Sequence, residues 1–165
     1  MNQTSSKHVR LLTVAPSTRG FGYCVMEGQV ILECGSKGVK GDKNLHSIAK
    51  IERLMKQFLP GVLVLQDVNA KGCHRVRRIK TLHQRVIRLA AKQKCKVVLL
   101  SGNELRTTLL GNAKGTKHEM AESLAQKYPV ELAGKLPRKR RPWENEDARM
   151  DMFDAVGLAV AFLVK

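Results

Sequence analysis

Apolar residues gather in short runs near the start of the chain and recur at helical spacing further on. The run at Leu11–Val14 shows no polar face, which favours a strand buried on both sides. A turn is predicted at Pro16–Gly20 and a second β-rich run at Phe21–Met26, so the two runs are typical of a hairpin. A third strand is predicted at Gln29–Glu33. Three glycines mark the loop after it: Gly35, Gly38 and Gly41.

Helical periodicity and continuous apolar runs alternate over the middle of the chain. A helix is predicted from five apolar positions: Leu45, Ile48, Ile51, Met55 and Phe58. Asp42 or Asn44 can cap this helix, and Pro60 and Gly61 end it. Gly61–Val68 is a continuous apolar run typical of a buried parallel strand. The next helix has its predicted core face at Ile79, Leu82, Val86, Leu89 and Ala90, and a strand follows at Lys96–Leu100.

The C-terminal part predicts three further helices. The first covers Asn103–Leu110, and a flexible loop over residues 111–115 follows it. Thr116 and Glu119 fit a capping box at the start of the second, which ends before Pro129. A basic loop over residues 134–142 precedes the last helix, Glu146–Val164. This order of elements predicts an α/β fold with one mixed five-stranded sheet, helices on both faces, and a single domain over residues 1–165.

The charge balance indicates a polyanionic partner. The chain has 30 Lys and Arg residues against 14 Asp and Glu residues, which gives a formal net charge of +16. Each DNA phosphate that binds a basic side chain releases condensed counterions, and this release drives association. Such an excess therefore favours nucleic-acid binding over a merely soluble basic protein.

The four cysteines are far apart in the sequence: Cys24, Cys34, Cys73 and Cys95. No CxxC pair occurs, so the spacing indicates neither a zinc site nor a disulfide framework. No apolar stretch approaches the length of a membrane span, and the polar segment Met1–His8 is unlike a signal peptide. We expect an intracellular protein, cytoplasmic or in another reducing compartment.

Four segments together resemble the RuvC-type Holliday junction resolvases, which are RNase H-like nucleases. The segment VAPSTRG at 14–20 is similar to their opening hairpin, except that Ala15 stands at the position of a metal-binding Asp. The strand in VLVLQDVNA at 62–70 has Gln66 at the position of a Glu. LLGNAKGTKHE at 109–119 is similar to a segment with DNA-contacting lysines, and DARMDMFDAVGLAVAFL at 147–163 to an acidic C-terminal helix. The resemblance implies an RNase H-like sheet.

The same resemblance implies a Mg²⁺- or Mn²⁺-dependent endonuclease. Two metal ions about 3.5–4 Å apart hold the attacking and leaving oxygens of the phosphodiester, and such hard cations require oxygen ligands. Ala15 offers no ligand and Gln66 offers no charge, so the chain as written should cleave weakly or not at all. A deliberately silenced nuclease and a lineage without cleavage both fit this pattern, and the sequence leaves the two open.

Three acids of the predicted last helix are the remaining candidate metal ligands. Asp147, Asp151 and Asp154 are spaced i, i+4 and i+7, which predicts one shared helical face. A solvated first turn would also explain the first two. Asp154 lies in an apolar run and, with Asp151, is the expected catalytic acid. Asp67 follows Gln66 on a strand, so its side chain should point to the opposite face unless a bulge intervenes.

Basic residues in four segments are the candidate DNA contacts. They are Arg19; Lys71, Arg75, Arg77 and Arg78; Lys114 and Lys117; and Arg138, Lys139, Arg140 and Arg141. An exposed turn residue is an equal alternative for Arg19, and a solvated connector is the alternative for the last run. Trp143, beside that run, is a candidate for stacking on an unpaired base.

The implied partner is branched double-stranded DNA, bound by a homodimer and cut at four-way junctions. A rival interpretation is a naturally non-catalytic protein that binds branched DNA on the same scaffold. An RNA-binding protein is less favoured, because no segment resembles an RNA-binding module.

Overall fold

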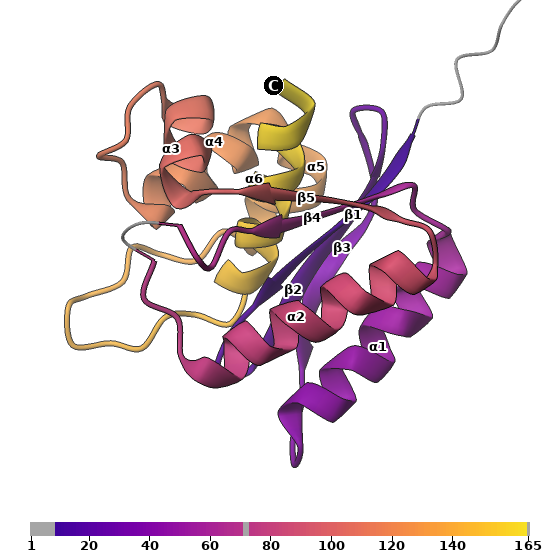
Figure 1. The fold of residues 1–165 in the computed structure, drawn as a ribbon. Coiled ribbons are helices and arrows are strands. Elements are labelled where there is room, and N and C mark those ends of the chain that lie inside the picture. The colour runs from indigo at the N-terminus through magenta and orange to yellow at the C-terminus, as the bar shows by residue number, and fades with distance from the viewer. Residues whose placement is uncertain (1–8, 71–72, 165) are drawn as a thin grey trace, which may run out of the picture.

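A computed structural model describes residues 9–70 and 73–164 (Figure 1). Five strands form one sheet in the order β3-β2-β1-β4-β5. Their bounds are β1 Arg10–Pro16, β2 Gly20–Glu27, β3 Val30–Gly38, β4 Val62–Gln66 and β5 Lys96–Leu100. The first three strands pair antiparallel, and β4 pairs parallel with both β1 and β5. The sheet is therefore mixed and five-stranded, as predicted.

Helices cover both faces of this sheet (Figure 1). Their bounds are α1 Lys43–Phe58, α2 Arg77–Lys92, α3 Gly102–Leu110, α4 Lys117–Lys127, α5 Pro129–Leu132 and α6 Met150–Val164, with a short 3₁₀ turn, η1, at Ala133–Lys135. Side chains of α1 and α2 pack on one face, and those of α4 and α6 pack on the other. The predicted α/β architecture is confirmed. No helix within residues 9–70 and 73–164 combines the length and apolar character needed to cross a bilayer.

Strand β1 lies at the centre of the sheet, and every residue from Leu11 to Pro16 is buried. This burial explains why the run has no charged residue. Because β1 and β4 run parallel with Val14 opposite Leu65, their carboxyl ends meet at one edge of the sheet. Ala15 and Gln66 are the residues that follow these two partners, so the fold brings them side by side.

The predicted helix starts are mostly confirmed. Asp42 caps α1, since its carboxylate accepts the backbone N–H of Leu45 at 3.1 Å. Thr116 and Glu119 form the predicted capping box of α4. A second capping box, formed by Ser101 and Glu104 at the start of α3, was not predicted. Helix α5 was not predicted either; it begins at Pro129, whose fixed φ suits a first helical position.

Two predicted boundaries are wrong. Strand β3 continues to Gly38, so Gly35 and Gly38 lie in the strand and not in a loop; Gly35 pairs with Tyr23, whose ring lies over it. Helix α6 begins at Met150 and not at Glu146. The Asp147 carboxylate accepts the backbone N–H of Arg149 at 2.9 Å, which makes a turn in place of a first helical turn.

Gly22 allows α6 to approach β2. A Cβ atom at Gly22 would lie 1.8 Å from the backbone oxygen of Asp151, and a backbone atom cannot rotate away. We expect Gly22→Ala to lower the free energy of unfolding by about 2–3 kcal/mol, because α6 must move off the sheet. Gly134→Ala is the matched control, since a Cβ there meets no atom within 4 Å. Urea unfolding of both variants checks this, and equal stabilities would contradict it.

Candidate active site and DNA interface

Ala15, Gln66 and Asp154 line one small cavity of about 80 Å³. Ala15 is the next-to-last residue of β1 and Gln66 is the last residue of β4, while Asp154 comes from the second turn of α6. The cavity is closed by apolar side chains of α3, α4 and α6, among them Leu105, Met120 and Phe153. The sequence positions singled out by the resemblance therefore meet in space, although they are 51 and 88 residues apart along the chain.

Lys117 brings a positive charge to the Asp154 side of this cavity. Its ammonium lies 3.1 Å from a carboxylate oxygen of Asp154 and 3.3 Å from one of Glu146. Burial lowers the pKa of Lys117, but the two carboxylates outweigh it and the net pKa is raised, so the ammonium stays charged. Burial raises the pKa of Asp154 to about 6 against the opposing attraction of Lys117.

Asp151 is the most buried acid of the site, with 3% of its surface exposed. Its carboxylate accepts hydrogen bonds from the Ser17 hydroxyl at 2.7 Å and from the Arg19 guanidinium at 3.3 Å. Burial raises the pKa of Asp151, and these two donors oppose the rise. The turn between β1 and β2 is thus tied to the start of α6, and Arg19 is held in this contact and is not a free turn residue.

Gln66 occupies the place of the expected Glu and is engaged by a cation. The Arg75 guanidinium donates to the Gln66 side-chain oxygen at 3.1 Å. A neutral amide oxygen satisfies this donor without adding a negative charge to the cavity. Arg75, Arg106 and Lys117 all line the cavity, which therefore has three cations against the single carboxylate of Asp154 on its wall.

Asp147 does not share a helical face with Asp151 and Asp154, so that prediction is wrong. It precedes α6 and forms two hydrogen bonds with the Arg149 guanidinium, at 2.9 and 3.0 Å. These bonds and the backbone N–H of Arg149 lower the pKa of Asp147 to about 2. Glu146 stands in its place: one ligand atom each of Glu146, Asp151 and Asp154 lie within 4.8 Å of one another.

Asp67 is turned away from this cluster, as the alternation along β4 predicts. It lines a separate cavity with His83 and Ile87 of α2, and its carboxylate accepts the backbone N–H of Asn69 at 3.0 Å. Asp67 is therefore no substitute for the missing acid at Gln66. Glu146 was missed because, in the predicted helix Glu146–Val164, it lies off the face that Asp147, Asp151 and Asp154 would share. In the structure Glu146 belongs to the loop before α6, and that loop brings it to the acids.

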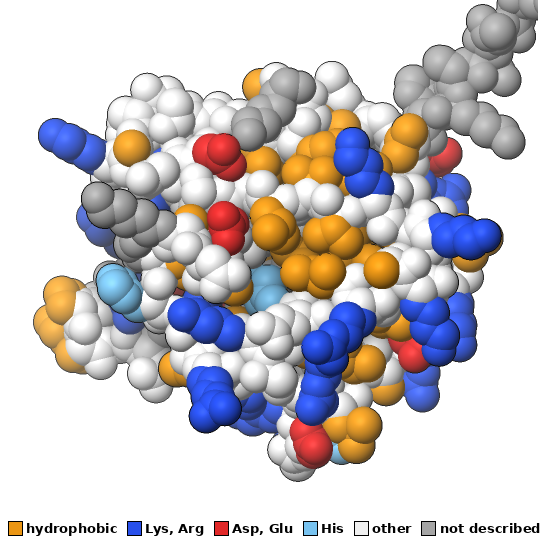
Figure 2. All heavy atoms as spheres, viewed as in Figure 1, with side chains coloured by type: hydrophobic (Ala, Val, Ile, Leu, Met, Phe, Trp, Pro, Cys, Tyr) orange, Lys and Arg blue, Asp and Glu red, His pale blue; other side chains and the backbone are white. Residues whose placement is uncertain are grey.

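The predicted DNA contacts fall into two structural groups. Arg19, Arg75, Arg78 and Lys117 are partly buried and bonded to protein oxygens; Arg78, for example, donates to the Ser17 carbonyl at 2.9 Å. Exposed members are Arg77, Lys114, Arg138, Lys139, Arg140 and Arg141. Lys71 lies outside the described residues. Figure 2 draws the molecule in the view of Figure 1, and Lys and Arg side chains gather there over the region where α1 and α2 lie.

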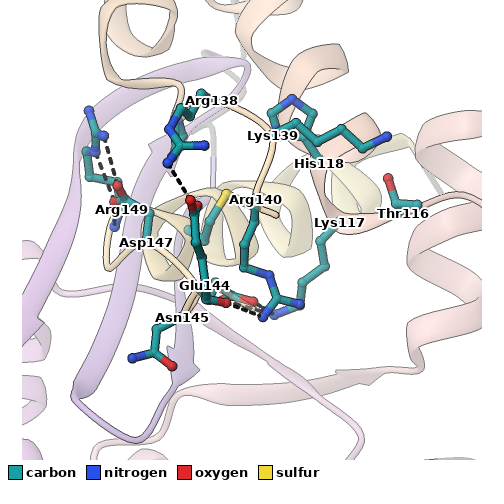
Figure 3. Close-up of a pocket in the computed structure, with 13 residues that line it drawn as sticks. Thr116, Lys117, His118, Arg138, Lys139, Arg140, Glu144, Asn145, Asp147 and Arg149 are labelled. Carbon is teal, nitrogen blue, oxygen red and sulfur yellow. Dashed lines mark hydrogen bonds and ion pairs between the residues drawn. The ribbon is translucent and has the colours of Figure 1, made fainter. Parts of the chain in front are cut away.

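The loop between η1 and α6 encloses a larger cavity of about 610 Å³ with the start of α4 (Figure 3). Its wall includes Arg138, Lys139 and Arg140 from the loop, and Lys117 and His118 from α4. Glu144 holds the loop, since it accepts from Arg138 at 2.7 Å. Lys117 lines both cavities, so the basic loop borders the candidate active site.

These residues do not fit the pair of metal ions that the resolvase resemblance implies. Ala15 has no ligand atom, the Gln66 oxygen is bonded to Arg75, and Asp151 is bonded to Ser17 and Arg19. Asp154 and Glu146 share the ammonium group of Lys117. A divalent cation here would have to displace an ammonium group and would gain at most three carboxylates. Phosphate contact by Arg75 and Lys117 is the chemistry that this arrangement favours.

Comparison with solved structures agrees with this architecture. Thermus thermophilus RuvC superposes with a TM-score of 0.64 at 14% identity, over 91% of this chain and 92% of that chain. T. thermophilus RuvC in complex with a Holliday junction substrate gives 0.68 at 13% identity, over 93% and 92%. The yeast mitochondrial Holliday junction resolvase Ydc2 gives 0.64 at 15% identity, over 95% and 78%.

The chain has the RuvC-type, RNase H-like fold. This confirms the fold implied by the four sequence segments. No protein-family model matches the sequence, and no curated protein matches it either. At 13–15% identity the likeness between these three structures and this chain concerns the fold.

We expect the free energy of unfolding to fall as the pH rises from about 4 to about 7. The pKa of Asp154 is about 6 in the folded protein against an ordinary value of 3.8. The folded state therefore holds this proton more tightly, and stability present below pH 4 is lost as the pH passes 6. Because a quarter of the side chain is exposed and Lys117 is adjacent, we expect a loss of about 1–3 kcal/mol.

Urea unfolding at pH 4 and pH 7 measures this loss, with Asp154→Asn as the control. The Asn variant has no carboxyl to titrate at this position and should lose less stability between the two pH values. Equal losses in the two proteins would contradict the assignment.

Proposed function

We propose that this protein binds branched DNA, four-way junctions in particular, and does not cut it by a two-metal mechanism. The observation that carries the proposal is the cavity that Ala15, Gln66 and Asp154 share, where Lys117 and Arg75 supply positive charge. In a resolvase-like scaffold this cavity would face the DNA backbone. Three lining cations, which include Arg106, and few free carboxylates suit the binding of a phosphate better than its hydrolysis.

The charge of the chain supports a DNA partner. The net charge is +16, and the exposed basic residues on α2, in the loop after α3 and in the loop before α6 are available for phosphates. A RuvC of the same fold has been solved in complex with a Holliday junction substrate, which supports a branched substrate here. We further propose a homodimer, and an intracellular, reducing location in keeping with the free thiols of all four cysteines.

A second candidate function is metal-dependent endonucleolysis through a rearranged acid set. The close approach of Glu146, Asp151 and Asp154 favours it, because three carboxylates within 4.8 Å can hold one Mg²⁺ or Mn²⁺ ion. The ion would have to displace Lys117, so we place this function second.

The double variant Ala15→Asp with Gln66→Glu should gain Mg²⁺- or Mn²⁺-dependent cutting of four-way junctions, because it returns two carboxylates to the cavity that already contains Asp154. The unaltered protein should cut at least 100-fold more slowly, as expected when ligands of a metal site are missing. Gel analysis of labelled junctions with and without EDTA measures both rates.

The matched control is Ala15→Asn, which fills similar space without charge and should stay inactive. Brisk metal-dependent cutting by the unaltered protein would establish the second candidate function. A double variant that folds and binds junctions but never cuts them would show that the scaffold does not position two metals.

Four-way junctions should outcompete linear duplex of equal length by at least tenfold at physiological salt, because the basic surfaces lie on several elements and can engage separate arms. Affinity for both DNAs should fall steeply with salt, since counterion release contributes to each. A competition gel shift at two salt concentrations measures this, and light scattering of the free protein tests the dimer. Equal affinity for junction and duplex would indicate a general nucleic-acid binder.

A further inference from the structure

Trp143 is the single tryptophan of the chain, and 77% of its surface is exposed. It lies in the loop between η1 and α6, and Pro142 alone separates it from the run Arg138–Arg141. Large aromatic side chains usually gain stability from burial, so an indole exposed beside four basic residues is uncommon on a surface without a partner. The candidate site makes no use of this ring.

Hydrogen bonds within the loop hold the backbone around Trp143. Glu144 accepts from the Arg138 guanidinium at 2.7 Å, and its backbone N–H donates to the Arg141 carbonyl at 3.0 Å. The Arg140 guanidinium donates to the Glu144 carbonyl at 3.1 Å. Figure 3 shows Glu144 held by Arg138. Because the backbone is bonded at Arg141 and at Glu144, on either side of Pro142 and Trp143, little backbone freedom remains to be lost when the ring binds a ligand.

The charges around the ring favour an anionic, aromatic ligand. The Arg141 guanidinium lies 5.7 Å from the centroid of the Trp143 ring, a cation–π arrangement. Lys139 and Arg140 are exposed in the same loop and line the 610 Å³ cavity. Cations beside an accessible indole are the pairing by which proteins hold the phosphates and stack on the bases of unpaired nucleic acid.

We propose that Trp143 stacks on an unpaired DNA base while Lys139, Arg140 and Arg141 hold the neighbouring phosphates. This inference rests on the proposed binding of branched DNA and adds the part of the DNA that this loop recognises. In a duplex both faces of a base are covered by its neighbours, so only a base opened at a branch point or in a single strand offers a free face. The contact requires no particular base, because every base has a π face.

The single tryptophan makes the contact directly measurable. Its emission should be quenched when a four-way junction with unpaired thymines at the branch, or a dT strand, is added, and should change little with blunt duplex of equal length. Trp143→Ala should weaken binding of that junction by roughly 5- to 100-fold. Trp143→Phe keeps an aromatic face and should retain most of the affinity. Val130→Ala is the control, since Val130 is 93% exposed on α5 and lies outside the loop.

The outcomes separate this inference from the proposed function. Junctions that bind Trp143→Ala as tightly as the unaltered protein, with no quenching, would overturn the stacking and leave junction binding intact. Quenching by the dT strand, together with equal affinity for junction and duplex, would support the stacking and contradict the junction preference. Stronger quenching by a uridine RNA strand than by the dT strand would overturn the assignment to DNA.

Discussion

The close contact between the β1–β2 hairpin and the start of α6 fixes the positions of the candidate site residues. Gly22 lets the backbone of Asp151 approach β2, where any side chain would collide with it. The Thr13 hydroxyl donates to the Ala155 carbonyl at 2.6 Å, and the Ser17 hydroxyl binds the Asp151 carboxylate. The two hydroxyl groups, together with the absence of a side chain at Gly22, therefore hold the apolar helix α6 against the sheet in one register. Asp154 faces the ends of β1 and β4 only in that register.

The charges of the site agree with the absence of carboxylates at Ala15 and Gln66. A pair of metal ions would bring four positive charges and would need several carboxylates to balance them. Here two protein cations stand beside the three acids: one ammonium group lies between Glu146 and Asp154, and Arg19 lies beside Asp151. Arg75 is satisfied by a neutral amide. Glu146 and Asp154 share Lys117, and Asp151 pairs with Arg19, so side chains of the protein already occupy the positions beside these acids that a divalent cation would need.

The sequence predicts the parts of this molecule that depend on local periodicity. The buried strands β1 and β4, the helical face of α2 and the capping box at Thr116 follow from the spacing of apolar and capping residues, and the structure confirms them. The meeting of Ala15, Gln66 and Asp154 could be predicted only through the resemblance to a family, because it depends on how strands pair.

The sequence does not predict features set by single tertiary contacts. The glycines of β3 are typical of a loop, yet pairing with β2 keeps them in a strand. The start of α6 depends on a turn at Asp147, and the role of Glu146 depends on where that turn places a loop. His83 is a further example: it is buried on the core face of α2, a position that periodicity assigns to an apolar residue.

Lys117 lies between two acids, so any ligand that binds its ammonium group also changes the surroundings of those acids. If the proposed function holds, a DNA phosphate that recruits this ammonium takes it from Glu146 and Asp154 at once, and leaves two carboxylates within 4.8 Å of each other without that counterion. Two like charges at that distance disfavour each other's ionisation, and Asp154, with a pKa of about 6, is the group that most readily accepts a proton. Under the proposed function, occupation of the cavity by a phosphate would therefore draw a proton from solution, and binding would be coupled to proton uptake.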